Sequence, residues 1–189
     1  CGINVANAVY NHSDNKEQTI AIIGTGFLAR VTHYTLKRNG YKNFTVYGSA
    51  YPDYWDNEDV TQIKHSGFHL QMPKDTMGFD AFIDFSSKAQ YITSNYVNPN
   101  GIFVMAAEKK VDNLDFSKYL WDNITIKCPS PRDPHFISCM KQAEEYVKRG
   151  IIMPEDSWTH EYSSDKIDIA FAENINKRPN MGRSYIKWQ

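Results

Sequence analysis

The feature that most constrains this chain is the stretch of residues 19–29, which reads TIAIIGTGFLA. Five strand-forming or small residues run into Gly24 and Gly26, and a segment with helical spacing follows. A strand that turns this tightly into a helix needs Gly24, where a side chain would clash, and a small Ala29, where helix and strand touch. Gly26 lets a diphosphate approach the backbone, and the N–H groups and dipole of the helix start favour a phosphate. The stretch predicts a dinucleotide-binding turn, and the alternative is a tight turn that binds nothing.

Composition limits the classes of protein to consider. The 189 residues suit one domain with a core between two helical layers and a sheet. A net charge of −1, without a Lys/Arg run, argues against nucleic acid as a partner. No apolar run approaches the roughly 18 residues of a membrane span. Three cysteines without paired spacing favour a reduced, cytoplasmic protein. Because the first residue is not Met and a helical pattern begins at once, we expect a piece of a longer protein.

Strands alternate with helices along the chain, which predicts an α/β protein of the Rossmann type. We expect a doubly wound, mostly parallel six-stranded sheet with helices on both faces. The expected strands are residues 19–23, 44–47, 68–70, 79–85, 102–105 and 124–127, with a closing strand at 183–188. The expected helices are residues 3–11, 27–40, about 86–97, 133–149 and about 163–176. Asp133 is expected to cap its helix, with Pro134 in the first helical position.

The end of the second strand bears on the choice between NAD and NADP. In NAD-binding folds, an acid about 20 residues after the glycines accepts a hydrogen bond from the ribose 2′-hydroxyl. Gly48 and Ser49 occupy that place here, and no carboxylate occurs before Asp53. An acid would repel a 2′-phosphate, whereas N–H and hydroxyl groups can donate hydrogen bonds to one. NADP is therefore predicted over NAD, although no base occurs before Lys64. The missing acid also argues against a methyltransferase.

Small residues are expected at the ends of two further strands. Ligands of open α/β sheets bind outside the carboxyl ends of the strands. Ser86, Ser87, Ala106 and Ala107 fall there and leave room for ribose and nicotinamide. The acids of the fourth strand are expected to cap or pair rather than to form an acid/base couple. The six histidines show no metal-ligand spacing and are expected at the surface or packed.

Several stretches together resemble the medium-chain dehydrogenase/reductase, or zinc alcohol dehydrogenase-like, superfamily. They are the cofactor turn at 22–29, the FDAFID strand at 79–84, GIFV at 101–104, ITIK at 124–127 and the THEY…IDIAF tail at 159–171. The resemblance covers almost the whole chain, but only the family's cofactor domain and C-terminal tail. It implies a junction helix and loop from a missing catalytic domain at 1–18, a dinucleotide-binding domain at 19–150 and a tail at 151–189 that packs back on it.

The resemblance also implies site residues and a function. Cys1 stands where many members place the last protein ligand of a catalytic zinc, which takes three protein ligands and an open position; the alternative is a frayed terminal residue. Arg183 stands where the family's terminal strand contacts the cofactor diphosphate, and the alternative is a solvated surface arginine.

The implied protein is an NAD(P)-dependent oxidoreductase that transfers hydride between nicotinamide and a small alcohol, polyol or polyol phosphate, or the matching carbonyl. Zinc would serve the full-length enzyme, and this chain alone would be an inactive fragment. A homodimer joined at the sheet edge near residues 111–116 and Trp121 is expected from the same resemblance. The alternative is a Rossmann-type nucleotide-sensing or interaction module without catalysis.

Overall fold

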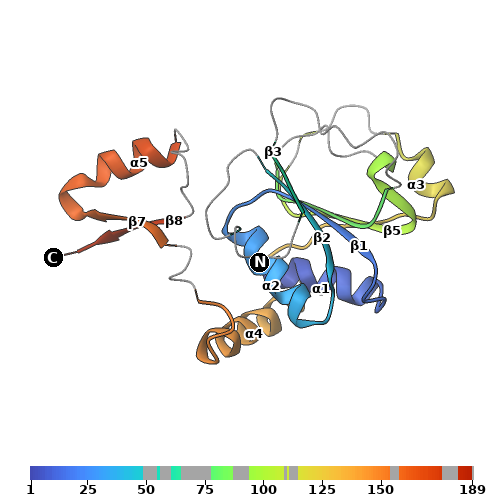
Figure 1. Ribbon diagram of the computed structural model, residues 1–189, viewed down its shortest axis with the longest axis horizontal. Helices are drawn as coiled ribbons and strands as arrows, with labels where there is room; N and C mark the ends of the chain where they lie inside the picture. The colour runs from blue at the N-terminus through green and yellow to red at the C-terminus, as the bar shows by residue number, and fades with distance from the viewer. Residues whose placement is uncertain are drawn as a thin grey trace.

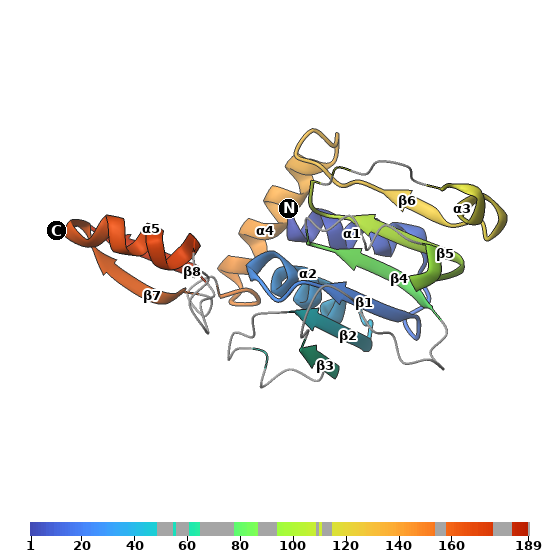
Figure 2. The ribbon, with the colours of Figure 1, turned by 90° about the horizontal axis from the view of Figure 1, so that it is seen from above.

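The computed structural model describes residues 1–48, 55, 61–64, 78–86, 94–108, 110, 115–153, 158–175 and 183–188, with residues 61–64 and 94 described by their backbone alone. Its centre is a six-stranded sheet in the order β3-β2-β1-β4-β5-β6, in which every neighbouring pair is parallel (Figure 2). The strands are β1 Thr19–Ile23, β2 Asn43–Gly48, β3 Thr61–Lys64, β4 Phe79–Asp84, β5 Val97–Met105 and β6 Thr125–Lys127. The predicted Rossmann-type sheet is confirmed.

Two strands differ from their predicted positions. β3 is Thr61–Lys64, whereas the predicted strand 68–70 lies outside the described residues. β5 begins at Val97, five residues before the predicted start. Val97 pairs with Phe79 of β4, and the register then shifts, so that the next pair is Ile102 with Ala81. The extra residues between them include a proline, which has no N–H to donate to the ladder. The predicted turn before Ile102 is therefore a bulge within β5.

One face of the sheet is covered by α1 (Gly2–His12) and α2 (Phe27–Arg38), which lie side by side in Figure 1. Their apolar faces join the central strands in one buried cluster. The two helices approach closely at their first turns. The approach is so close that a Cβ on Gly2 would lie only 2.9 Å from the Leu28 carbonyl oxygen. Thr32 also donates its hydroxyl to the Gly2 carbonyl oxygen at 2.9 Å. α2 is followed by Gly40 at a φ of +94°, as its sequence predicted.

The other face carries a second buried cluster. Phe82 of β4 stacks on Tyr96 of the 3-10 helix η3 (Ser94–Tyr96) and on Phe103 of β5, with ring centroids 5.3 and 5.7 Å apart. The short helix α3 (Ser117–Trp121) adds Tyr119 to this layer. Of the helix expected at about 86–97, residues 87–93 lie outside the described range; Ser86 is not helical, Ser94–Tyr96 form a 3-10 helix and Val97 belongs to β5.

Helix α4 (Phe136–Lys148) packs against the first turns of α1 and α2 through Cys139. It begins at Phe136 rather than at Pro134. Asp133 instead closes a turn ahead of the helix, in which its carboxylate accepts the His135 N–H at 2.9 Å and its carbonyl oxygen accepts the Phe136 N–H at 2.9 Å. Gly150, at a φ of +63°, follows the helix as predicted.

The C-terminal residues form a separate unit, seen at one end of the molecule in Figure 2. β7 (Trp158–Ser163) and β8 (Arg183–Lys187) make a two-stranded parallel sheet, and α5 (Ile167–Ile175) packs on it through the hydrogen bond from Tyr162 to Glu173. β7 was not predicted, and the 3-10 helix η5 (Ser164–Lys166) delays the start of α5. The division into a junction, a cofactor domain and a tail stays a prediction. In the described ranges, no helix has the length and apolarity needed to cross a membrane.

Asp80 ties the start of β4 to its two neighbouring strands. Its carboxylate accepts the Thr19 N–H at 2.8 Å, the Thr19 hydroxyl at 2.9 Å and the Asn98 side-chain amide at 2.8 Å. Burial acts to raise the pKa of Asp80, but the donations from Asn98 and Thr19 outweigh it and hold the pKa below its usual range. A group with a lowered folded-state pKa stabilises the fold above its unfolded pKa, near 4, and loses this contribution as pH falls through the folded value.

Replacing Asp80 with asparagine is therefore expected to lower the free energy of unfolding by about 1 kcal/mol at pH 7, since these hydrogen bonds are charge-assisted and partly exposed. The difference from the parent should shrink as pH falls below about 4, where the carboxylate of the unfolded chain takes up a proton, and should be lost once pH falls through the lowered folded-state pKa. Urea unfolding of both proteins at pH 7 and pH 3 measures it. Asp14→Asn is the control, because the Asp14 side chain is 83% exposed in its ion pair with Lys16. A deficit of Asp80→Asn that is as large at pH 3 as at pH 7 would contradict the pKa argument.

Candidate dinucleotide-binding site

The turn between β1 and α2 requires glycine at its first position. Gly24 has a φ of +116°, which L side chains rarely adopt, and a Cβ there would lie 3.1 Å from the Phe85 Cβ. Its N–H donates to the Tyr47 carbonyl oxygen at 2.7 Å, which fixes the turn to the end of β2. Gly24 is thus demanded by the fold itself, as the sequence predicted.

Gly26 is different, because neither its backbone angles nor any described neighbour requires a glycine there. Its φ of −76° and ψ of 179° suit any residue, and a Cβ there would meet no described heavy atom within 4 Å. Gly26 caps α2, whose first N–H groups have no acceptor within the helix. The first turn carries no acid, so the helix dipole offers a net positive end. The open space over Gly26 is therefore a place where an anionic group can reach the backbone, and it fits a dinucleotide diphosphate.

The carboxyl ends of four strands meet around this turn. Ile23 pairs with Tyr47 of β2 and with Asp84 of β4, and Asp84 pairs with Met105 of β5. The ladder continues one residue further, since Phe85 donates to the Ile23 carbonyl oxygen and Ala106 to the Asp84 carbonyl oxygen, each at 2.9 Å. The structure thus gathers most of the predicted site residues at one edge of the sheet: Gly24, Thr25, Gly26, Phe27, Leu28, Gly48, Ser86, Ala106 and Ala107. Ser49 and Ser87 lie outside the described residues.

Gly48 packs directly against the turn. A Cβ at Gly48 would lie 2.3 Å from the Thr25 Cγ2 and 2.7 Å from the Thr25 hydroxyl oxygen. Real Cβ atoms essentially never approach another heavy atom so closely, so glycine is required at this position by Thr25. Packing against Thr25 therefore explains why Gly48 has no side chain, and this explanation holds for either cofactor. It was not predicted from the sequence.

Arg183 reaches the site from the C-terminal unit. Its guanidinium lies over the ring of Phe27, the first residue of α2, at 4.7 Å from the ring centroid. The pair is a cation–π contact. It places a positive charge beside the helix start, where the sequence resemblance implied a diphosphate contact.

Cys1 is exposed and precedes α1. With Gly2, it lines an apolar cavity of about 190 Å³ together with Phe27, Leu28 and Met140. Across the described part of the chain, no group of three or more His, Cys, Asp or Glu side chains could hold a metal ion. The described residues alone do not complete a catalytic zinc site, so no chemical step is assigned to one, and the zinc-ligand role of Cys1 stays a prediction.

The histidines within the described ranges are not gathered at the turn. His33 is buried beside Phe44 and Trp55, with ring centroids 4.7 and 5.5 Å away. His12 lies at the surface, 3.0 Å from the Asn100 carbonyl oxygen. His65 and His69 lie outside the described residues.

Two contributors to the site were missed from the sequence. Trp55 is fully buried and donates its indole N–H to the Thr25 carbonyl oxygen at 3.0 Å. Nothing in its polar surroundings in the sequence distinguished it from the neighbouring aromatic residues. Helix α4 supplies Met140 and Phe136 to the cavity beside Leu28. Their spacing of four residues signals a helix face, but not which partner covers it.

The parallel sheet, its strand order and the covering helices together define a fold of the Rossmann type. No family model and no curated protein matches the sequence. Solved structures match over nearly the whole chain. L-idonate 5-dehydrogenase from Escherichia coli has 13% identity and a TM-score of 0.73, over 98% of this chain and 54% of that one.

Two further similar structures contain a nicotinamide cofactor. An alcohol dehydrogenase from Escherichia coli, complexed with NADH, has 15% identity and a TM-score of 0.74, over 96% of this chain and 56% of that one. A Sinorhizobium meliloti protein, described as a zinc-binding dehydrogenase and bound to NADP, has 14% identity and a TM-score of 0.68, over 99% and 56%. The chain thus spans slightly more than half the length of these dehydrogenases. At the level of the fold, its resemblance to part of a medium-chain dehydrogenase is confirmed.

Proposed function

We propose that this chain is the NAD(P)-binding part of an alcohol or polyol dehydrogenase or reductase of the medium-chain type. The observation that carries the proposal is the open space over Gly26 at the start of α2, at the edge where the carboxyl ends of β1, β2, β4 and β5 meet. A glycine that neither the backbone angles nor the packing requires is explained by a ligand that must approach the backbone.

The described residues divide the binding task among them. The N–H groups that begin α2 would hold the diphosphate, and the Arg183 guanidinium beside Phe27 would add charge and hydrogen bonds to it. Ser86, Ala106 and Ala107, at the ends of β4 and β5, leave room for ribose and nicotinamide. Nicotinamide dinucleotides supply hydride transfer to or from an alcohol or carbonyl carbon when bound. A small alcohol, polyol or polyol phosphate is the proposed substrate, in a protein longer than this chain and located in the cytoplasm.

The proposed cofactor is NADP rather than NAD. No described residue at the end of β2 is an acid that could accept a hydrogen bond from a ribose 2′-hydroxyl, and Thr25 leaves no room for one at Gly48. Calorimetric titration of the chain with NADPH and NADH is expected to give a lower Kd for NADPH, by about tenfold. Equal or tighter NADH binding would reject the preference while keeping the dinucleotide site. Binding of neither would reject the proposed function.

A non-catalytic nucleotide-sensing module is the alternative. The dehydrogenase and the sensor differ in the protein segment that is joined to this chain. A dehydrogenase needs a segment whose groups contact the substrate, and a sensor does not. The upstream reading frame decides between them: a segment that encodes zinc ligands favours the dehydrogenase, and an unrelated domain favours the sensor.

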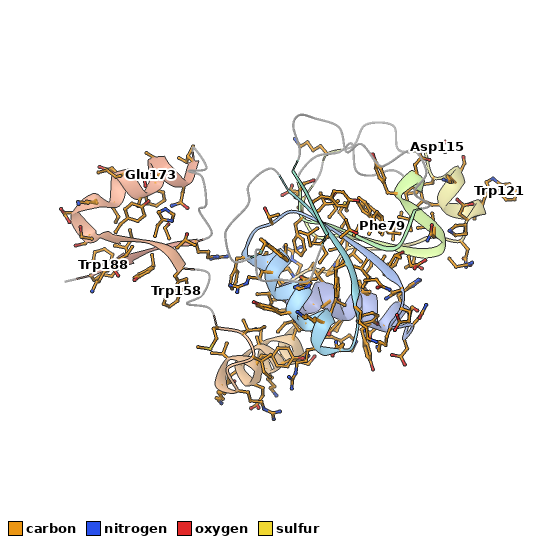
Figure 3. All side chains as sticks on the ribbon, in the orientation of Figure 1. Phe79, Asp115, Trp121, Trp158, Glu173 and Trp188 are labelled. Atoms are coloured by element: carbon orange, nitrogen blue, oxygen red, sulfur yellow. The ribbon has the colours of Figure 1, made fainter. Side chains whose placement is uncertain are left out.

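We also propose a homodimer joined near the β6 edge of the sheet; residues 111–114 of the expected segment 111–116 lie outside the described residues. Phe116, Leu120 and Trp121 are exposed there, and Trp121, at 83% exposure, projects away from the sheet in Figure 3. Burying these side chains would stabilise a dimer at about 25 cal/mol per Å² of apolar surface. Light scattering across a dilution series is expected to show a dimer for the parent and a monomer for Phe116→Lys. The control is Phe171→Lys, on the outer side of α5. A parent that stays monomeric at high concentration contradicts the dimer.

A further inference from the structure

Trp55 is the one described residue between Gly48 and β3, and its side chain is fully buried. It lies in the cluster beneath α1 and α2, with the His33 ring 5.5 Å from its own. The other three tryptophans are at least half exposed. A single buried tryptophan, next to the candidate cofactor turn, needs a reason beyond filling the core, since its N–H must find a partner when buried.

That partner is the backbone of the glycine turn. The indole N–H of Trp55 donates to the Thr25 carbonyl oxygen at 3.0 Å, while the Thr25 side chain packs against Gly48. Thr25 is therefore contacted by two residues that follow it in the chain: Gly48, at the end of β2, and Trp55. The middle residue of Gly24-Thr25-Gly26 is held on two sides.

The hydrogen bond sets the direction of a neighbouring donor. The peptide group that joins Thr25 to Gly26 is planar and trans, so its C=O and N–H point in opposite directions. Trp55 draws the Thr25 carbonyl oxygen towards the buried side of the turn. The Gly26 N–H must then point away from that buried side, and a ligand can approach the backbone here, since a Cβ on Gly26 would meet no described atom within 4 Å.

We infer that Trp55 is a positioning residue for dinucleotide binding: its indole N–H orients the Thr25–Gly26 peptide so that the Gly26 N–H faces the cofactor diphosphate. The inference rests on the proposed function and adds to it a residue that does not touch the ligand. Without the indole N–H, Thr25 keeps only its packing against Gly48, so the Thr25–Gly26 peptide can rotate and a donor aimed at the diphosphate is lost part of the time.

The test compares NADPH, which contains the diphosphate, with adenosine, which lacks it. NADPH and adenosine are titrated into the parent, Trp55→Phe and the control Trp188→Phe, whose side chain is 74% exposed. Trp55→Phe is expected to raise the Kd for NADPH about fivefold to tenfold, the effect of weakening one hydrogen bond, and to leave the Kd for adenosine unchanged. The control should match the parent for both ligands.

If Trp55 had a purely structural role, Trp55→Phe would raise the Kd for both ligands alike, and that result overturns the inference. An unchanged Kd for NADPH also overturns it. If the parent binds NADPH and the variant does not fold, β-(3-benzothienyl)alanine at position 55 decides. This residue keeps the shape of tryptophan and lacks the N–H, so the same selective loss of NADPH binding supports the inference and its absence overturns it. A parent that binds no NADPH rejects the proposed function first, and the inference falls with it.

Discussion

Replacing Gly26 with valine is expected to raise the Kd for NADPH by about a hundredfold, while the free energy of unfolding changes by less than about 1 kcal/mol. The reason is that the backbone angles of Gly26 suit a valine and its Cβ direction is open. The added methyl groups would fill the space that the diphosphate needs. Calorimetric titration and urea unfolding of the same preparation measure the two effects separately.

Gly24→Ala is the matched control, two residues away. Its φ of +116° and the Phe85 Cβ at 3.1 Å make any side chain costly, so we expect a loss of about 2 kcal/mol in the free energy of unfolding. The two glycines thus separate a requirement of the ligand from a requirement of the fold. A Gly26→Val protein that binds NADPH as tightly as the parent contradicts the proposed site.

The second large effect is expected at Gly48. An aspartate there would be the usual means of turning an NADP site into an NAD site, but its Cβ would lie 2.3 Å from the Thr25 Cγ2. We expect Gly48→Asp to lower the free energy of unfolding by about 3 kcal/mol, which is the cost of overpacking at a buried contact. Thermal and urea unfolding measure it.

Thr25→Ala supplies the control, because it removes the two side-chain atoms nearest to position 48. Gly48→Asp in this background should recover part of the lost stability, and its carboxylate should then favour NADH over NADPH. Thr25→Ala alone shows what the truncation itself costs. Gly48→Asp with the stability of the parent would show that the contact between the turn and β2 has been misjudged.

The parts of the site that the sequence predicted are those that local geometry determines. Gly24, Gly26 and Ala29 mark a turn whose shape follows from a few consecutive residues, and β1 and α2 begin and end close to where the pattern indicates. β4 was also predicted within one residue, because a buried parallel strand is apolar on both faces and Ala81, Phe82 and Ile83 are consecutive.

The missed parts depend on contacts between distant residues. β3 and β7 contain no continuous apolar run, so only their pairing with β2 and β8 reveals them. The contact between Thr25 and Gly48 and the hydrogen bond from Trp55 join residues more than 20 positions apart. The separate sheet of the C-terminal unit, on which Trp158 and Trp188 are seen in Figure 3, likewise follows from pairing rather than from local pattern.

The central claim is that a nicotinamide dinucleotide binds over Gly26 at the carboxyl edge of the sheet. A ¹H–¹⁵N NMR titration of the chain with NADPH tests it most directly. The amide signals of Gly24, Gly26 and Leu28 are expected to shift with one saturable curve, while that of Gly101, in the β5 bulge at the opposite edge, stays in place. Saturable shifts confined to the Gly101 edge, or no shifts at millimolar NADPH, would contradict the claim.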